Sequence, residues 1–427
     1  MSAGSAAILA WIQDHPGAGP RDIEGVFPSL SRTTLNRWLR DLADQGSVVS
    51  VRRGPITQHY ASDLKGFFDK PVTRRTPAPF DRERAVAALP RFRAEQLQRM
   101  RNAMPRPAQT AEETARAVRE RLMIEISFAS SRLEGNTYDL IETQALLEYG
   151  QQAAGKSAEE ARMILNHRDA IRYLLDHIDD VQIDKKTILD VHALVSNGLL
   201  AQRRDEGQVR ERGVSITSST YQPLDNRFQL EEVLEEMLEH VAHETDPFNQ
   251  SLMLMVGIAY LQPFADCNKR TGRLMANLPL IKASLSPLSF ITVDAANYTR
   301  GLLAYYELGF TEIISSAFVS GYIESAESYR LLAVPKGRSA EQKGFELKYR
   351  AFGTNYIKRL VRGEVSLDPE LPGTVPAEDH APLKQHLQQL VQDLHPGQAV
   401  VYGLQREEVE RFLQRLSAAG GATGIQR

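Results

Sequence analysis

The sequence YLQPFADCNKRTGRLMANL, from Tyr260 to Leu278, gives the first indication of how this 427-residue chain folds. Pro263 ends the apolar helix before it, because the residue that precedes a proline avoids the helical conformation. A polar turn follows, and a new helix is predicted from about Arg270 through Leu278. Backbone N–H groups at the start of a helix are unsatisfied donors at the positive end of its dipole. The stretch therefore predicts a phosphate-binding turn between two helices.

The side chains of this turn also indicate a phosphate-binding site. Arg270 and Arg273 share one face of the new helix, and each presents a planar fork that suits phosphate oxygens. Lys269 adds a positive charge, and Asn268 can either fix the turn or donate to the anion. Asp266 at the rim is a hard oxygen ligand, which suits Mg²⁺ shared with a polyphosphate. We therefore expect a nucleotide here rather than an ordinary arginine-rich helix start.

The stretch resembles the signature of the Fic family, His-Pro-Phe-x-Asp/Glu-Gly-Asn-x-Arg-x-x-Arg, and the resemblance extends over roughly residues 110–330. Fic proteins are helical, and most of them transfer AMP from ATP to a hydroxyl group of a target protein. The resemblance implies ATP and Mg²⁺ as ligands, with the metal on Asp266, the α- and β-phosphates on Asn268 and the γ-phosphate on Arg273. The nucleotide-binding residues that it implies are Cys267, Asn268, Lys269, Arg270, Gly272 and Arg273.

Two positions depart from the signature. Cys267 stands where the family has glycine, either as a small tolerated residue or as a thiol made reactive at the helix N-terminus. Gln262 stands where the family has the histidine that deprotonates the attacking hydroxyl, and an amide has no usable basicity. Loss of a general base lowers a rate by about 10²–10⁴-fold. We therefore expect nucleotide binding with AMP transfer lost or weakened, and Gln262 is a degenerate base position.

The run SSRLEGNT, Ser130 to Thr137, resembles the inhibitory motif of Fic proteins, Ser/Thr-x-x-x-Glu-Gly/Asn. Glu134 is expected at the end of a long helix, where its charge opposes the dipole, and Gly135 suits the residue that ends the helix. The resemblance implies that Glu134, with Ser130 and Gly135, pairs with Arg273 and withholds it from the γ-phosphate. The alternatives are a solvated glutamate without this role, or one that orients a hydrolytic water.

Residues 214–224, VSITSSTYQPL, alternate β-branched residues with polar ones and end in proline, which predicts extended structure. Together with GQVR, Gly207 to Arg210, they resemble the flap of Fic proteins. That flap aligns a target side chain by strand addition, a known mode of peptide recognition. The partner implied is a target protein that offers a hydroxyl group.

Residues 1–65 predict three helices and a hairpin about a Gly-Pro turn, the order of a winged helix-turn-helix domain. Ser31 suits the N-cap of the third helix, and Gly46 suits its end. A basic helix with a basic wing is an arrangement that reads DNA, although a winged helix can also dock on protein. The DNA-binding residues predicted are Arg32, Arg37, Arg40, Arg52 and Arg53.

The chain as a whole is predicted to be mostly α-helical. We expect a winged helix-turn-helix at 1–65, a basic connector at 66–109, a Fic-type helical bundle with a small β-hairpin flap at 110–330, and a helical region at 331–427. The connector is either a phosphate-contacting surface or a solvated linker face. The net charge of −3 gives no global sign of nucleic-acid binding, and one cysteine excludes a disulfide framework. Since no signal peptide or membrane span stands out, we expect a cytoplasmic protein.

The histidines of the helical runs do not have the spacing of a metal site. They are expected to be structural or surface residues, and they are His167, His192, His240 and His243. Two functions compete on these grounds. The first is a DNA-binding transcriptional regulator, expected as a homodimer, with a nucleotide-sensing Fic-like domain. The alternative is a working adenylyltransferase restrained by Glu134, and a third idea is a toxin-like or nucleotide-hydrolysing activity.

Overall fold

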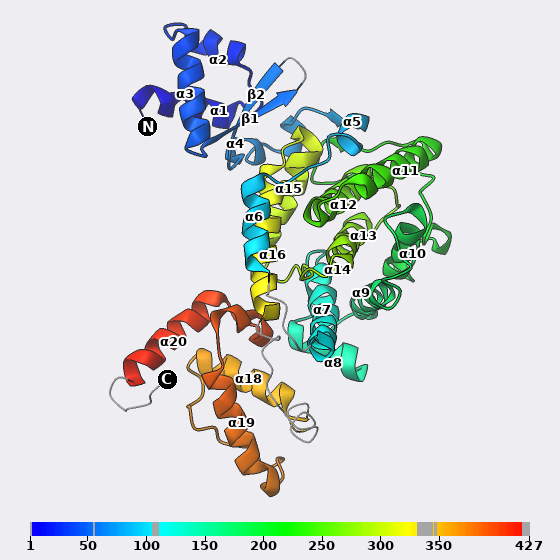
Figure 1. The fold of residues 1–427 in the computed structure, drawn as a ribbon, viewed down its shortest axis with the longest axis vertical. Helices are drawn as coiled ribbons and strands as arrows, with labels where there is room; N and C mark the ends of the chain where they lie inside the picture. The colour runs from blue at the N-terminus through cyan, green and yellow to red at the C-terminus, as the bar shows by residue number, and fades with distance from the viewer. Residues whose placement is uncertain (1, 54–55, 105–110, 331–344, 346–347, 421–427) are drawn as a thin grey trace. The chain divides into compact units, whose positions relative to one another are not determined.

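The computed structural model describes residues 2–53, 56–104, 111–330, 345 and 348–420, and in them the chain is mostly helical (Figure 1). The chain divides into two compact units. The first comprises Met1–Leu97, Asp179–Ala283 and Val293–Ser320, and the second comprises Gln98–Ile178, Ser284–Thr292 and Gly321–Arg427. These units cross the boundaries expected from the sequence, and those boundaries stay predictions.

The first unit begins with three helices and a hairpin, which is the predicted order. The elements are α1 (Ala3–Asp14), α2 (Pro20–Val26), α3 (Arg32–Asp44), β1 (Val48–Arg53) and β2 (Ile56–Ala61). Ser31 caps α3 by accepting a hydrogen bond from the Thr34 N–H group, and Gly46 after the helix has a φ of +67°. The two strands pair antiparallel, and the loop at Ala18 forms a bridge to His59 of β2. The turn at residues 54–55 lies outside the described residues.

The connector is ordered and packs on the helices of the first unit. It contains α4 (Lys65–Phe68), η1 (Val72–Arg74), β3 (Ala78–Pro79), α5 (Arg82–Ala85) and α6 (Ala94–Ala103), the last of which contributes to both units. Residues 105–109 lie outside the described residues. Arginines of the connector pair with acidic residues later in the chain: Arg82 with Glu232 and Glu236, Arg91 with Glu244, and Arg93 with Glu312. Because these ion pairs neutralise the arginines within the protein, they argue against a phosphate-contacting surface on the connector.

A central buried helix organises the rest of the first unit. This part of the first unit contains α10 (Lys185–Ser196), η2 (Arg203–Asp205), β4 (Tyr221–Gln222), α11 (Arg227–His243), α12 (Pro247–Leu261), α13 (Asn268–Met275), α14 (Asn277–Lys282) and α15 (Ala295–Leu308). The central helix is α12. Asp246 caps α12 and Pro247 occupies its first turn, a pattern typical of a helix start. Nearly every residue of α12 is buried, as expected of a helix that is apolar all round. It packs against α11, α13, α14 and α15 (Figure 1).

Two details of the prediction are corrected. The helix expected from Arg270 through Leu278 begins earlier, at Asn268, and breaks at Ala276 into α13 and α14. Pro279 explains the break, because proline lacks the N–H group that would bond the carbonyl of Met275. The hairpin expected in residues 214–224 is not formed there either. The strand in this segment, β4, instead pairs in parallel with β3 of the connector, with Ala78 opposite Tyr221.

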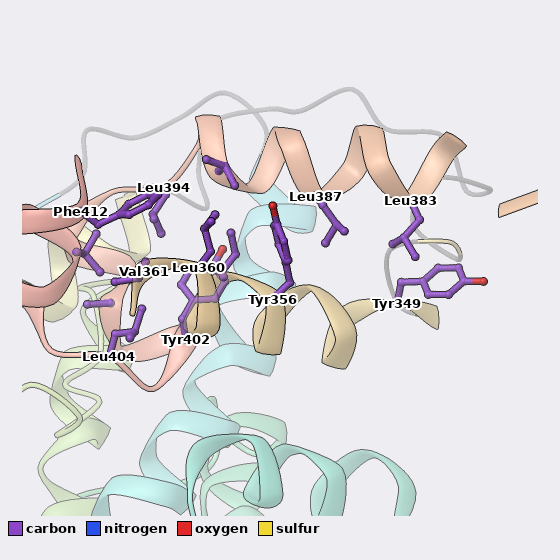
Figure 2. Close-up of a cluster of buried hydrophobic side chains, with 14 of the residues drawn as sticks. Tyr349, Tyr356, Leu360, Val361, Leu383, Leu387, Leu394, Tyr402, Leu404 and Phe412 are labelled. Carbon is purple, nitrogen blue, oxygen red and sulfur yellow. The ribbon is translucent and has the colours of Figure 1, made fainter. Parts of the chain in front are cut away.

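The second unit contains α7 (Ala111–Arg132), α8 (Leu140–Tyr149) and α9 (Ala158–Asp176), followed later in the chain by α18 (Arg350–Val361), η4 (Ala377–Asp379), α19 (His380–Gln392), η5 (Pro396–Tyr402) and α20 (Arg406–Gly420). Helix α16 (Glu312–Arg330) contributes to both units. The C-terminal helices have a core of their own, in which Tyr356 of α18 faces Leu387 of α19 (Figure 2). Phe412 of α20 belongs to the same buried cluster. Among the described residues no helix is long and apolar enough to cross a membrane.

Candidate nucleotide site

The predicted phosphate-binding turn joins α12 to α13 in the first unit. Gln262 ends α12 with a φ of 53°, and Cys267 precedes α13 with a φ of 62°. Both residues adopt the left-handed helical backbone conformation, which costs glycine less than any other residue. This geometry explains why glycine suits the position of Cys267. The Cys267 side chain is buried, so the structure favours a tolerated small residue over an accessible reactive thiol.

The Gln262 side chain is fixed inside the turn. Its Nε2 atom donates to the Ala259 carbonyl at 2.7 Å, and its Oε1 atom accepts from Asn268 Nδ2 at 3.0 Å. Asn268 also donates to the Phe264 carbonyl and accepts from the Phe264 N–H group, both at 2.9 Å. Of its two expected roles, Asn268 therefore fixes the turn. Gln262 is held by hydrogen bonds and offers no group that accepts a proton.

Arg270 is buried, and two of its three nitrogen atoms have no hydrogen-bond partner among the described residues. Its Nη2 atom donates to Asp266 Oδ2 at 3.2 Å, and its side chain is only 7% exposed. Its Nε and Nη1 atoms are buried and have no hydrogen-bond partner in the described part of the chain. A buried donor left without a hydrogen-bond partner costs about 1–3 kcal/mol, and more when the group is charged. An anion in the turn would remove this cost.

Arg273 is fully buried one helical turn further along α13. Its Nη1 atom donates to the hydroxyl of Tyr298 on α15 at 3.2 Å, and its guanidinium lies 5.5 Å from the centre of that ring. Nothing in the sequence drew attention to Tyr298, which is 25 residues away. Lys269 on the same helix is half-buried. Gly272 serves packing, because a Cβ atom there would lie 2.9 Å from the Met255 carbonyl of α12.

Asp266 remains open to solvent at the rim of the turn. Its side chain is 67% exposed, and Oδ1 accepts from the Cys267 N–H group at 2.5 Å. The described residues contain no cluster of three or more histidine, cysteine or acidic side chains that could hold a metal ion. One carboxylate with room for phosphate oxygens is the arrangement in which Mg²⁺ is bound together with its nucleotide. Asp266 thus fits the predicted role only when a polyphosphate supplies further ligands.

His192 lies beneath the turn and is structural. Its ring stacks on Phe264 with centroids 3.7 Å apart, Nδ1 accepts from the Gly207 N–H group at 3.0 Å, and Nε2 is 3.2 Å from the Asp266 carbonyl. Because Nδ1 accepts, the proton must sit on Nε2, which donates to that carbonyl. Burial lowers the pKa of His192 to about 4. With both nitrogens engaged, His192 cannot replace the missing base at Gln262.

Arg210 is a site residue whose role the sequence did not reveal, although it belongs to the quoted GQVR run. It is 2% exposed, and its guanidinium donates to the carbonyls of Gln262 at 2.8 Å, Arg212 at 2.7 Å and Leu224. Burial is the main cause that lowers its pKa. Arg210 therefore joins Leu224, at the end of the flap, and Arg212, just before the flap, to the residue before Pro263.

The predicted inhibitory residues lie in the second unit, just beyond the end of α7. Ser130 is within the helix, and Glu134 lies in the turn after Arg132 rather than in the last helical turn. Gly135 has a φ of +93°, as expected of a helix stop. The Asn136 side chain and the Thr137 N–H group donate to Glu160 of α9, both at 2.9 Å, which anchors this turn. The Thr137 hydroxyl, which donates to the same carboxylate, is the largest of the causes that lower the pKa of Glu160 to about 2. The pairing of Glu134 with Arg273 stays a prediction.

The predicted DNA-binding residues of α3 lie on its exposed side. Arg37 and Arg40 are exposed, and Arg32 is exposed with an ion pair to Glu24 at 3.4 Å. Arg52 and Arg53 end β1, next to residues 54–55, which lie outside the described residues. Of the other histidines, His167 is buried, His243 bonds the Glu239 carbonyl, and His240 contacts Arg91.

A cavity of about 1040 Å³ lies away from the signature turn. It is lined by the end of α1, the connector and the end of α15, including Trp11, Arg74, Arg75 and Glu307. The cavity therefore does not mark the predicted nucleotide site.

Comparison with known proteins identifies a family domain in the part of the chain that contains the turn. The Fic/DOC family model matches residues 182–280. Protein adenylyltransferase fic-1 of Caenorhabditis elegans is 27% identical over 179 residues, which cover 40% of this chain and 34% of that protein. Protein adenylyltransferase Fic of Nematostella vectensis is 27% identical over 188 residues, 43% of each. The matches thus span between a third and a half of these relatives.

Two solved structures are similar at a low level. Fic-1 from C. elegans aligns with a TM-score of 0.44 at 23% identity, covering 55% of this chain and 69% of that chain. A Fic domain-containing signaling protein from Bacteroides thetaiotaomicron aligns with a TM-score of 0.45 at 18% identity, covering 57% and 97%.

Proposed function

Because the chain carries a Fic/DOC family domain at residues 182–280, we propose that it binds ATP at the turn before α13 and senses it without efficient AMP transfer. The observation that carries this proposal is Arg270, whose buried Nε and Nη1 atoms have no partner among the described residues. A buried cation of this kind is stabilised by an anion that accepts hydrogen bonds from both atoms. The triphosphate of a nucleotide offers such oxygens next to the amides at the start of α13.

Gln262 is the reason for proposing a sensor. Its amide bonds the Ala259 carbonyl and Asn268, so it helps to hold the shape of the turn. A hydroxyl group brought to the site would keep its proton, because an amide cannot take it and His192 is engaged on both nitrogens. Nucleotide binding, which needs only donors and charge, is not affected in this way. When bound, Mg²⁺ on Asp266 would neutralise phosphate charge.

DNA is the second ligand that we propose. Arg37 and Arg40 extend from the exposed side of α3, and the three helices and hairpin have the order of a winged helix-turn-helix. Two copies of the chain would present two such helices to half-sites, so the regulator would act as a homodimer in the cytoplasm. Bound nucleotide would change how the two copies meet the DNA.

The alternative function is an autoinhibited protein adenylyltransferase, favoured by the names of the C. elegans and N. vectensis relatives. In that case ATP would be the substrate, and the flap at 214–224 would align a hydroxyl group of a target protein or of the chain itself. The hydroxyl would lose its proton late, or to a group of the substrate such as a phosphate. Glu134 would restrain the reaction.

A transfer assay separates the two functions. The native protein, Glu134→Gly, Gln262→His and the double variant are incubated with labelled ATP and Mg²⁺. We expect label on protein only with the double variant, at a rate about 10²–10⁴-fold above Glu134→Gly alone, because histidine restores the base. Robust labelling by the native protein, or by Glu134→Gly alone, would support the transferase and contradict the sensor.

A further inference from the structure

We propose that Glu307 and Arg75 are positioning residues that hold the flap, residues 214–224, in place through the connector. The inference rests on the proposed function only in that the flap borders the nucleotide site. Glu307 lies at the end of α15 and Arg75 in the connector, 232 residues apart in the chain. Their side chains are 2% and 8% exposed and meet at 3.1 Å between Oε1 and Nη1.

The Glu307 carboxylate receives donors from the flap as well as from Arg75. Its Oε1 atom accepts from Ser219 Oγ at 2.8 Å and from the Thr220 N–H group at 3.3 Å. The Thr220 hydroxyl is 3.0 Å from Oε2 and 2.8 Å from the Thr76 carbonyl, and it can donate to either. One buried carboxylate thus joins α15, the connector and the flap.

The connector also uses one edge of the flap strand. The Ala78 N–H group donates to the Thr220 carbonyl at 3.2 Å, and β3 pairs in parallel with β4. Since successive N–H groups of a strand point to opposite sides, Pro77 and Pro79 occupy the positions that face away from β4. Proline has no N–H group, so the outer edge of β3 cannot accept another strand in the ordinary way. Strand addition by a target is therefore left to the rest of the flap.

Arg75 connects this cluster to the N-terminal helices. Its Nε atom donates to the Lys70 carbonyl at 3.0 Å, and its guanidinium lies 4.9 Å from the ring centre of Phe67. Lys70 in turn donates to the Asp14 carbonyl at the end of α1 at 2.7 Å. A continuous series of contacts therefore connects α1 to the flap.

On its other side the flap is joined to the helix that leads to Gln262. The Tyr221 hydroxyl donates to the Tyr260 carbonyl at 2.8 Å, and the Tyr260 hydroxyl accepts from the Asp81 N–H group at 2.9 Å. The rings of Tyr221 and Tyr260 stack with centroids 4.7 Å apart. A flap released from Glu307 would lose its position relative to the site, while the donors of Arg270 and Arg273 on α13 would stay in place.

Amide hydrogen exchange tests this inference on the full-length protein. The variants are Glu307→Gln, Arg75→Ala, Arg75→Lys and Ser219→Ala, and the peptides followed contain residues 76–81 and 214–222. Arg82→Ala is the matched control, because Arg82 anchors the same connector to Glu232 and Glu236 without touching the flap. ATP affinity is measured for every variant by calorimetry.

We expect Glu307→Gln and Arg75→Ala to speed exchange in both peptides by about tenfold to a hundredfold, the effect of losing a charge-assisted hydrogen bond. Arg75→Lys should exchange more slowly than Arg75→Ala, Ser219→Ala should affect the flap peptide, and Arg82→Ala should leave it unchanged. ATP affinity should stay the same. Should Glu307→Gln fail to fold, Arg75→Ala and Ser219→Ala carry the test.

Unchanged flap exchange in Arg75→Ala and Ser219→Ala, or an equal rise in Arg82→Ala, would overturn the inference. If the flap responds as expected but neither the native protein nor Glu134→Gly binds ATP, the proposed function fails and the positioning role stands. The two failures are therefore distinguishable in one set of experiments.

Discussion

Arg210 joins the base of the flap to the turn that carries Gln262. It donates to three carbonyl groups from a side chain that is almost fully buried. We predict that Arg210→Ala lowers the free energy of unfolding by about 3–5 kcal/mol, because the carbonyls lose their charged donor. Urea denaturation measures this change. Arg212→Ala is the control, since its pair with Asp205 is at the surface and is worth at most about 1 kcal/mol. Equal losses in the two variants would contradict this role for Arg210.

Helices α12 and α13 approach each other closely at Gly272. A Cβ atom there would lie 2.9 Å from the Met255 carbonyl, so the two helices would have to move apart. We predict that Gly272→Ala destabilises the protein by about 1–3 kcal/mol, the cost typical of overpacking. Gly25→Ala in α2 is the matched control, because among the described residues no atom outside its chain neighbours and helix backbone lies within 4 Å of an added Cβ. There alanine should stabilise the helix by roughly 0.5–1 kcal/mol. Thermal melting of both variants checks the opposite signs, and destabilisation of equal size in both would contradict the packing role.

Strand β2 contains a buried histidine, His59, and we expect it to make the N-terminal helices and hairpin sensitive to acid. His59 Nδ1 lies 2.9 Å from Ser50 Oγ, and Nε2 is buried without a hydrogen-bond partner in the described residues. Burial lowers the pKa of His59 below 6.5, so the unfolded chain binds a proton more readily than the folded one. The stability that neutral His59 contributes is therefore present above about pH 6.5 and declines as the pH falls below it.

We predict that His59→Gln is less sensitive to acid than the native protein. Urea midpoints are compared at about pH 7.5 and pH 5, on either side of the ordinary histidine pKa. The native midpoint should fall more between the two than that of the variant. An equal fall in both proteins would show that His59 does not contribute to acid sensitivity.

For the whole molecule, the proposal of a DNA-binding regulator makes a prediction about salt. Arg37→Ala and Arg40→Ala should each weaken binding to the protein's own promoter DNA and reduce the slope of log K against log salt by about 1. Fluorescence anisotropy over a range of salt concentrations measures both quantities. Arg162→Ala on α9, an exposed arginine in the second unit, should leave them unchanged. Absence of salt-dependent binding to any genomic fragment would contradict the DNA role.

What the sequence could predict was largely local. Ser31, Gly46 and Asp246 act within a few residues of their own positions, so the ends of their helices were predictable. The break at Ala276 was missed because Pro279 lies beyond the stretch that defines the turn. The family resemblance singled out Arg270 and Arg273. The family match to residues 182–280 confirms the resemblance over that range, and the roles of the two arginines stay predictions.

What the sequence could not predict depends on partners far apart in the chain. The pairing of Ala78 with Tyr221 joins segments separated by more than a hundred residues, and no local pattern announces it. The same holds for Glu307, which no motif includes, and for Tyr298 beside Arg273. The burial of other side chains was also not predictable from the sequence. His192 and Arg210 could have been surface residues, but tertiary packing buries both next to the turn.

Calorimetry with ATP and Mg²⁺ tests the central claim most directly, namely that the turn before α13 binds a polyphosphate. Glu134→Gly is titrated beside the native protein, so that the predicted inhibitory glutamate does not mask binding, and Arg82→Gln serves as a control for loss of an arginine. We predict that Glu134→Gly binds ATP, and that adding Arg270→Gln weakens the affinity about tenfold to a hundredfold through lost charge-assisted hydrogen bonds. Arg82→Gln should have no effect. No binding of ATP or any other nucleotide by the native protein or by Glu134→Gly would contradict the account.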